Sequence, residues 1–348
     1  MGRLLIDSLE ELRGKSVLVV GIGGGGDALG ALLVLLRLRS LGVRAILGCV
    51  VWERFVLDPF PGPVPMEQFV NAEILGRAVA MVDVSSYVDR YGYRFKPQIV
   101  RASEILGEKV LSFDLSKGEV GLTEALDLVG EKLGIDAIIG VDVGGDVIAS
   151  GCEDELWSPL ADSISLGALY KTKIPAAIAV LAPGADGELS QGKVLERISE
   201  IAKLGGLIGV YGVTRSEYKV LRKYLEMFVS EASKIPFEAF EGGYGRKGIR
   251  MGSRLVEVNV VSATFYILDV ELVYRSNLLA NLISGTRSVE EARARMNKHC
   301  IYTELDLEED LYKLRLEGGH VTGRSLLDVR GEGRRRLLLS GCTPLKCT

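Results

Sequence analysis

Acidic side chains gather in the segment GVDVGGDVIASGCEDELWSPLAD, which spans residues 140–162. We expect a buried strand to end at Asp142 and Val143, with Asp146 in the turn that follows it. Crowded carboxylates without a basic neighbour either bind a hard cation or have raised pKa values suited to proton transfer. Asp142 and Asp146 are therefore candidate catalytic residues, and Asp146 with Glu153 is a candidate pair of Mg²⁺ ligands.

A glycine-rich turn follows the first apolar run of the chain, in VLVVGIGGGGDALG, residues 17–30. Gly21, Gly23 and Gly26 satisfy GxGxxG, in which glycines let the backbone approach an anion at a helix N-terminus. Asp27 follows directly, and a carboxylate there repels a phosphate unless a cation lies between them. The sequence leaves three roles open for Asp27: a helix N-cap, a Mg²⁺ ligand that bridges to a phosphate, or a catalytic acid or base.

The same glycine turn also supports a dinucleotide-binding alternative. That motif places an acidic residue about 20 positions further on, at the end of the second strand, where it binds a ribose hydroxyl. Glu53 is such an acid, although it lies 27 positions after Gly26. An oxidoreductase that uses NAD or FAD is therefore the second interpretation of this segment.

Two further segments carry candidate ligand-binding side chains. Asp186 and Glu188 flank a glycine in LAPGADGEL, where a plain Asp-Gly turn is the alternative. Arg250 lies in EGGYGRKGIRMGSR, residues 241–254, which is either a mobile segment that closes over an anion or a solvated surface loop. The full set of candidate ligand-binding residues is Gly23, Gly24, Gly25, Gly26, Gly144, Gly145, Glu153, Ser158, Asp162, Asp186, Glu188 and Arg250.

The elements that position these residues alternate between strands and helices. Apolar runs predict strands at 16–20, 43–52, 79–84, 110–114, 137–143, 176–181, 207–211 and 264–269. Helical patterns occupy 28–41, 122–133, 159–170, 194–204, 215–233, 272–282 and 289–296. Such alternation predicts a Rossmann-like, doubly wound α/β fold, with a mostly parallel sheet and helices on both faces. Both glycine turns then leave the carboxyl edge of the sheet, where ligands bind in open α/β folds.

No strong linker divides the chain. We expect a single α/β domain over residues 1–328, with a smaller subregion from about residue 240. The segment RGEGRRRLLL opens a tail, residues 329–348, which we expect to be an arm or a mobile end.

Composition excludes several classes of protein. Hydrophobic residues make up 47% of the 348 residues and the net charge is only −4, which excludes intrinsic disorder and argues against nucleic acid as a partner. The longest apolar stretch, residues 28–36, is too short to span a bilayer, so we expect no membrane association. Residues 1–12 lack the apolar core of a secretory signal, which favours a cytoplasmic protein.

Histidine and cysteine usage narrows the chemistry. The two histidines, His299 and His320, exclude an HExxH zinc helix and a three-histidine metal site. Among five scattered cysteines, Cys342 and Cys347 either close a small loop or remain two thiols. Scarce Asn and Gln with abundant charged residues is typical of thermophilic proteins, for which a homo-oligomer is the default expectation.

The strings GIGGGGDALGA, VDVGGDVIASGCEDELWSPLADSISLGA and PGADGEL resemble an archaeal and actinobacterial domain-of-unknown-function family, number 1152, over roughly residues 15–280. The resemblance implies a shared fold and site and supplies no reaction. VDVGGD is also locally similar to the DGGNE loop of D-glutamate cyclase-like proteins, with Asp146 where that pattern has Asn.

The sequence therefore predicts an enzyme that acts on a small anionic metabolite, such as a phosphorylated or carboxylated compound or a nucleotide. The reaction would be a metal-assisted hydrolysis, group transfer or lyase step, in which the two glycine turns supply N–H donors to the anion. The alternatives are the NAD- or FAD-dependent oxidoreductase and a non-catalytic sensor that binds a nucleotide.

Overall fold

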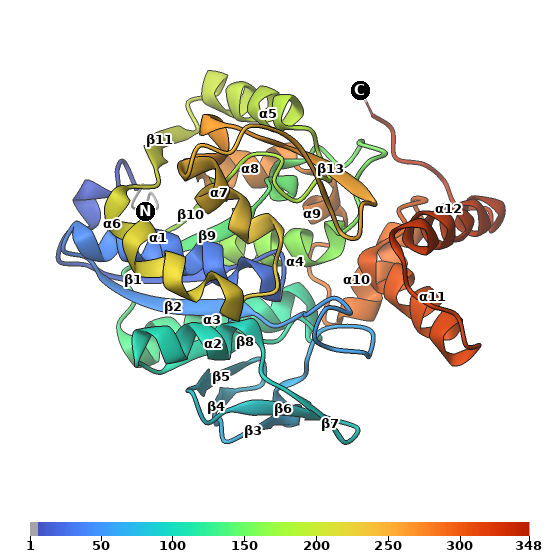
Figure 1. Ribbon diagram of the computed structural model, residues 1–348, viewed down its shortest axis with the longest axis horizontal. Helices are drawn as coiled ribbons and strands as arrows, with labels where there is room; N and C mark the ends of the chain where they lie inside the picture. Colours follow the sequence, from blue (N-terminus) through green and yellow to red (C-terminus); the bar gives the residue numbers. More distant parts are fainter. Residues whose placement is uncertain (1–5, 348) are drawn as a thin grey trace.

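A nine-stranded sheet forms the centre of the computed structural model, which describes residues 6–347 (Figure 1). Residues 1–5, part of the segment judged for a secretory signal, lie outside the described residues. Along the sheet the strands are β11 (Leu207–Gly212), β14 (Thr264–Asp269), β10 (Ala176–Leu181), β9 (Ala137–Val143), β1 (Ser16–Gly21), β2 (Arg44–Val50), β8 (Val110–Phe113), β5 (Val79–Val82) and β4 (Glu73–Gly76).

The five middle strands, from β10 to β8, are parallel, and antiparallel strands extend the sheet at both ends. β1 pairs with β2 on one side and with β9 on the other, so the chain builds the sheet outwards in opposite directions from β1. Every residue of β1 and β9 is buried, which explains why both read as continuous apolar runs. The gap between the ends of β1 and β9 is the topological switch point, where open α/β sheets bind ligands.

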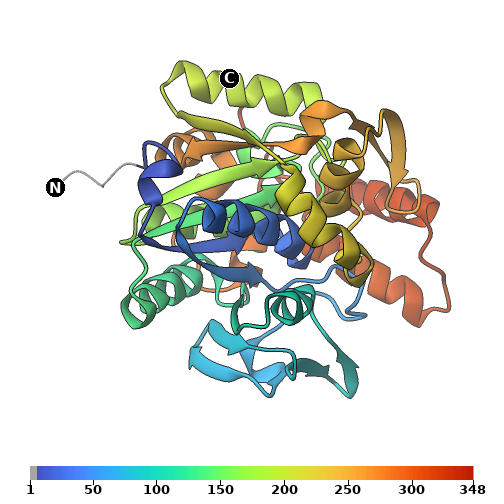
Figure 2. The same ribbon diagram turned by 60° about the vertical axis from the view of Figure 1, so that its left-hand side comes forward.

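Helices cover both faces of the sheet, which confirms the predicted Rossmann-like α/β class (Figures 1 and 2). Val17 and Val19 pack into the core on the side of α1 (Ala28–Ser40), whereas Leu18 and Val20 pack into the core on the side of α4 (Pro159–Lys171). The first layer also contains α2 (Gln98–Leu106), α6 (Arg215–Leu221) and α7 (Ile235–Phe240). The second contains α3 (Gly118–Leu133), α5 (Gln191–Lys203), α8 (Val270–Ser276), α9 (Leu278–Leu282) and α10 (Val289–Asn297).

Three smaller parts surround this core. A second sheet of β3 (Phe69–Val70), β6 (Tyr87–Arg90) and β7 (Tyr93–Phe95) lies at the bottom of Figure 1. The basic segment expected to be a loop is instead a hairpin of β12 (Gly245–Ile249) and β13 (Arg254–Val258). Helices α11 (Glu304–Leu316) and α12 (Gly323–Leu339) project at the right of both ribbon views.

None of the helices in the described range, 6–347, has the length and apolar character needed to cross a membrane.

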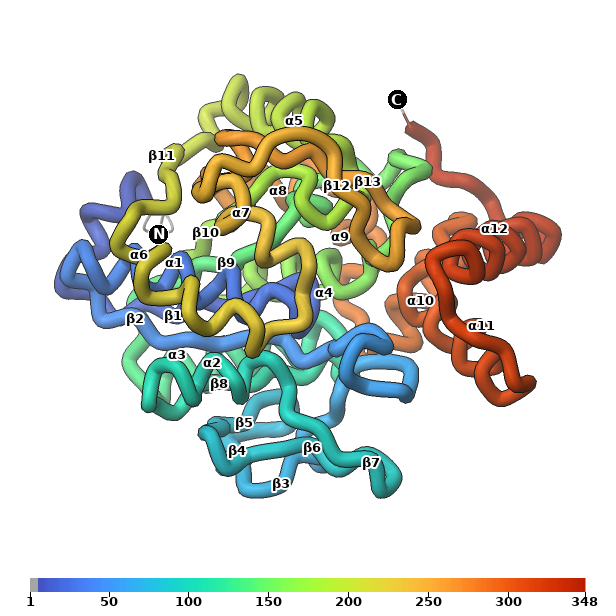
Figure 3. The backbone as a smooth tube through the Cα atoms, in the orientation of Figure 1, coloured from blue at the N-terminus to red at the C-terminus, as the bar shows by residue number. Residues whose placement is uncertain are grey.

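The expected long helix at 215–233 is wrong in its second half. Helix α6 ends at Leu221, a 3-10 segment continues to Met227, and the chain is then extended at Phe228. Side chains of α2 take the backbone groups that a longer helix would use: Gln98 Oε1 accepts from Val229 N at 3.1 Å, and Arg101 Nη1 donates to the carbonyl of Met227 at 2.5 Å. The break lets this segment run along α1 to the glycine turn (Figure 3).

The cysteine pairing also differs from both expectations. Cys342 and Cys347 do not pair with each other and are not free, because Cys342 bonds Cys300 and Cys347 bonds Cys152. The partners come from distant parts of the chain that the fold brings beside the C-terminus. The predicted tail boundary at residue 328 lies inside α12, so the tail begins as a helix. Near its end, two disulfides tie Cys342 and Cys347 to other parts of the chain.

Candidate functional site

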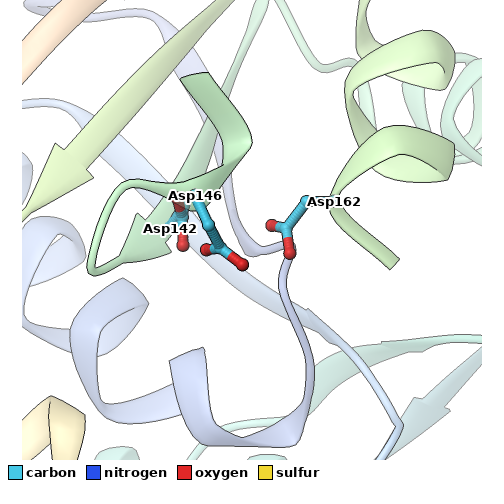
Figure 4. Close-up of side chains that lie close together, drawn as sticks. All are labelled: Asp142, Asp146 and Asp162. Atoms are coloured by element: carbon cyan, nitrogen blue, oxygen red, sulfur yellow. The ribbon is translucent and has the colours of Figure 1, made fainter. Parts of the chain in front are cut away.

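The two acidic turns meet at the switch point of the sheet. The turn after β1 contributes Asp27, and the turn after β9 contributes Asp142 and Asp146. The first turn of α4 brings a fourth carboxylate, Asp162, to face Asp142 and Asp146 (Figure 4). Pro159 at the start of α4 favours that helix start, because its fixed φ suits the first helical turn.

The glycines of these turns make room for carboxylates. A Cβ at Gly23 would lie 2.9 Å from Asp27 Oδ2 and 3.0 Å from Asp162 Oδ1. A Cβ at Gly144, whose φ is +126°, would lie 2.3 Å from Cγ of Asp186. Neither position tolerates a side chain, and Gly144 also needs backbone freedom that other residues lack.

The backbone amides of the turns are largely used within the protein. Gly23 N donates to Asp27 Oδ2 at 2.6 Å, and Gly25 N donates to the carbonyl of Trp52 at 3.0 Å. In the second turn, Gly144 N donates to the carbonyl of Leu181 at 2.9 Å. The amides of Gly23, Gly25 and Gly144 are therefore committed within the protein, and donation from the glycine turns to an anion stays a prediction for their other glycines.

Asp142, Asp146 and Asp162 form the best candidate cation site. Each offers one oxygen, and the three oxygens lie within 4.8 Å of one another. Within residues 6–347, Asp162 Oδ1 has no hydrogen-bond partner although the side chain is only 3% exposed, and no protein group donates to the carboxylate of Asp146. Asp142 uses one oxygen to accept from Val147 N at 3.1 Å. Three converging carboxylates with free oxygens fit the oxygen ligands that Mg²⁺ prefers.

Burial and mutual repulsion raise the pKa values in this cluster. The pKa of Asp142, Asp146 and Asp162 lies well above the usual range, mainly because burial disfavours the charged form and secondly because the neighbouring carboxylates repel. Burial also raises the pKa of Asp27 to about 7, against the opposing effect of N–H donors from Gly23 and Val143. A cation in the cluster would relieve both costs.

Asp146 also belongs to a second group with Asp186 and Glu188. Glu188 is committed elsewhere: it accepts from Trp157 N at 2.6 Å, from Ser158 N and Oγ, and it pairs with Arg254 at 3.0 Å. Burial alone would raise the pKa of Glu188, but Arg254 and these donors lower it to about 2. The second group is therefore the poorer cation site, since one member is already neutralised.

Three arginines line the same cavity. Arg54 donates to the carbonyl of Gly23 at 2.6 Å and pairs with Glu304 at 3.3 Å. Arg254 pairs with Glu188, whereas Arg250 is exposed and its side chain makes no hydrogen bond or ion pair with any described residue. Arg250 is thus a cation with no protein partner at the mouth of an acidic pocket.

Glu153 does not join the carboxylate cluster. Its oxygens accept from Ser150 N and Oγ, Gly151 N and Cys152 N, at 2.7–3.0 Å, and these donors lower its pKa against the effect of burial. It lines a separate cavity beside the C-terminal disulfides. The structure therefore does not bring Glu153 to Asp146, and Asp162 stands in the place expected for it.

Glu53 lies against the glycine turn, but its carboxylate is bonded to the start of α2. Its Oε1 accepts from Gln98 N at 2.9 Å and its Oε2 from Gln98 Nε2 at 3.1 Å. The carboxylate thus caps α2 and is buried under Gly25. Glu53 thus serves the start of α2, whereas the dinucleotide alternative expects it to bind a ribose.

The site is an inner cavity of about 60 Å³ that adjoins an outer cavity of about 350 Å³. The inner one is lined by Gly23, Gly24, Gly26, Asp27, Asp142, Asp146, Asp162, Asp186, Glu188 and Ser158 together with the three arginines. Ser158, Arg54, Arg250 and Arg254 line both, so they form the boundary between an acidic and a mainly apolar space. An anion bound there would meet cations on one side and the carboxylate cluster on the other.

Some of these residues could not be chosen from the sequence. Arg54 belongs to no motif. It reaches the pocket because β2 pairs with β1 and therefore ends beside the glycine turn. Arg254 belongs to the basic segment that suggested Arg250, and its contact with Glu188 required the hairpin. Ser230 lines the cavity because the helix expected at 215–233 breaks there.

The comparisons with known proteins give one match. The family model described as "Protein of unknown function (DUF1152)" matches residues 18–312. Neither a curated protein nor a solved structure matches the chain.

Proposed function

Because this chain belongs to the DUF1152 family, whose description names no activity, we propose its function from the geometry of the site. The protein is an enzyme that acts on a small phosphorylated metabolite. Asp142, Asp146 and Asp162 would hold a Mg²⁺ ion, which would supply Lewis-acid activation of the phosphate. The reaction is a metal-assisted hydrolysis or group transfer.

One observation carries this proposal: a buried cluster of carboxylates lacks the partners that buried charges require. Asp162 Oδ1 and Asp186 Oδ2 are buried and have no hydrogen-bond partner among residues 6–347. Removing partners from a buried charged group costs several kcal/mol. A fold that keeps such a cluster at the ligand-binding edge of its sheet is explained if a cation completes it.

The residues in and around the cluster would have separate roles in the reaction. A bound Mg²⁺ would neutralise the carboxylates and polarise an oxygen of the phosphate. Arg250 and Arg254 line the inner cavity and suit binding of the remaining phosphate oxygens, because guanidinium groups bind phosphate with two parallel N–H donors. Asp27, with a pKa of about 7, is suited to accept a proton from the hydroxyl or water that attacks phosphorus, and to pass it to the leaving oxygen as the bond between that oxygen and phosphorus breaks.

The site favours this function over the dinucleotide alternative. The acid expected to bind ribose caps α2 instead, and Gly23 N of the GxGxxG turn is bonded to Asp27. Both features weaken the support for a dinucleotide at this turn. A metal-linked phosphate uses the carboxylates and arginines that remain.

Isothermal titration with Mg²⁺ tests the metal site. The wild-type protein should bind Mg²⁺ with a Kd below the millimolar range, and Asp162→Asn should lose this binding. Asp7→Asn, the same chemical change at an exposed position, is the control. Phosphate release from a panel of phosphomonoesters and nucleotides then tests turnover. If wild type and Asp162→Asn take up Mg²⁺ equally, the proposed site is wrong; if Mg²⁺ binds without turnover on any substrate, the sensor alternative replaces the enzyme.

A further inference from the structure

The outer cavity has a composition unlike that of the inner one. Apolar side chains dominate its wall, including Phe55, Val56, Trp157, Leu307 and Leu311. Its volume of about 350 Å³ lies within the range of cavities that enclose a small organic ligand, roughly 300–1,000 Å³. Inorganic phosphate or a small sugar phosphate would leave this space unused.

A buried polar atom in the wall points to a bound molecule. Glu308 is only 4% exposed, and its Oε2 accepts from Trp52 Nε1 at 2.8 Å and from Gly62 N at 2.7 Å. Its Oε1 has no hydrogen-bond partner in the described part of the chain. Buried polar atoms in native proteins are almost always paired, so a polar group of a ligand in this cavity would complete Glu308.

Arg250 connects the two cavities. It lies at the turn of the β12–β13 hairpin, where its φ is +52°, and it lines both spaces. Its backbone N–H donates to Glu231 Oε2 at 2.7 Å, which holds the hairpin turn against the segment that follows α6. The turn is therefore anchored through its backbone while the guanidinium remains free for an anion at the boundary.

We propose that the substrate is an amphiphilic phosphate monoester whose apolar body fills the outer cavity and whose phosphate lies at Arg250, facing the carboxylate cluster. This inference rests on the proposed function and adds the substrate class. The apolar wall supplies affinity for the body, and the arginines at the boundary fix which end of the molecule enters the inner cavity.

A series of n-alkyl phosphates tests whether the apolar body and the phosphate bind in separate cavities. Affinity for ethyl, butyl and hexyl phosphate is measured by isothermal titration in the presence of Mg²⁺, with inorganic phosphate as the reference. Each methylene that becomes buried should tighten binding by up to about fourfold. Val56→Trp places a large side chain in the outer cavity at a residue that is 48% exposed and so need not disturb the core. Val84→Trp, at a residue that is 49% exposed and lines neither cavity, is the matched control.

The outcomes separate this inference from the proposed function. Wild type and Val84→Trp should show affinity that rises with chain length, and Val56→Trp should bind every member about as well as inorganic phosphate. Phosphate binding that needs Mg²⁺ but does not change with chain length overturns the inference and leaves the proposed function standing. A rise with chain length that is indifferent to Mg²⁺ and to Arg250→Ala overturns the proposed function and the placement of the phosphate. Absence of binding for the whole series overturns both.

Discussion

Replacing Asp146 with Asn should make the metal-free protein more stable and insensitive to Mg²⁺. Asp146 shares a cluster with Asp142 and Asp162 in which the nearest oxygens lie within 4.8 Å. Asparagine has nearly the same shape but no charge, so it removes repulsion from the metal-free cluster. It also removes the central ligand that belongs to both candidate cation groups.

The size of both effects follows from the geometry. Two unit charges 4.8 Å apart at an effective dielectric constant of 20 repel by about 3.5 kcal/mol. Protonation of the cluster already relieves part of this, so we expect a net gain of about 2 kcal/mol at pH 8. With an unfolding entropy of about 2.1 cal/mol/K per residue, that gain raises the Tm of this chain by about 3 °C. For wild type, Mg²⁺ at one hundred times its Kd adds about 2.7 kcal/mol, or about 4 °C.

Thermal melts at pH 8 with and without Mg²⁺ check this prediction, with Asp7→Asn as the exposed control. The expected pattern is a higher Tm for metal-free Asp146→Asn than for wild type, and a Mg²⁺ shift in wild type and the control only. A variant that melts several degrees lower and keeps the Mg²⁺ shift would show that Asp146 is a structural residue. The proposal that the cluster binds Mg²⁺ would then be wrong.

Three further predictions concern separate features of the structure. Arg250→Ala should weaken binding of phosphate in the presence of Mg²⁺ by roughly tenfold or more, because a charged hydrogen bond is lost. The Tm should stay within about 1 °C, since no described residue bonds that side chain. Titration and thermal melting check the two results, and a large fall in Tm would contradict the prediction. Burial raises the pKa of Glu308 to about 7 from its usual 4.5, so the folded state keeps a proton that the unfolded state releases, and stability falls by up to about 3 kcal/mol as pH rises from 4.5 to above 7. Glu308→Gln should consequently be more stable than wild type at pH 8 but not at pH 4.5 in urea melts, and an equal gain at both pH values would refute the cause. Reducing the Cys300–Cys342 crosslink, checked with Cys300→Ser, should lower stability by up to about 4 kcal/mol because the closed loop spans 42 positions; a Tm that does not respond to reductant would show that the bond does not form.

The alternation of strands and helices was readable because the buried strands are continuous apolar runs. The ranges expected at 137–143, 176–181 and 264–269 coincide with β9, β10 and β14. The start of one helix was predicted too late: α3 begins at Gly118, four residues before the expected start at residue 122. The small sheet of β3, β6 and β7 was missed, because its strands have only two to four residues and are partly exposed.

The candidate site could be located from the sequence but not assembled from it. Asp27, Asp142 and Asp146 follow strands that end at the same edge of a parallel sheet, so their convergence follows from the topology. The sequence predicts Glu153 as the metal ligand beside Asp146, and Asp162 only as a ligand-binding residue, because no local pattern separates two acids of one segment. Only the fold shows that Glu153 folds back onto its own turn while α4 carries Asp162 into the cluster.

The α/β class, the order of the main elements and the edge of the sheet at which acids gather could all be predicted from the residues, because hydrophobic periodicity and glycine turns act over a few neighbouring positions. Which groups meet across long separations emerged only from the folded chain. It set Arg54 beside Gly23, gave Glu53 to the start of α2, and paired Cys152 with Cys347, which is 195 positions away. These contacts depend on strand crossings, helix breaks and close packing, and no local pattern of residues encodes them.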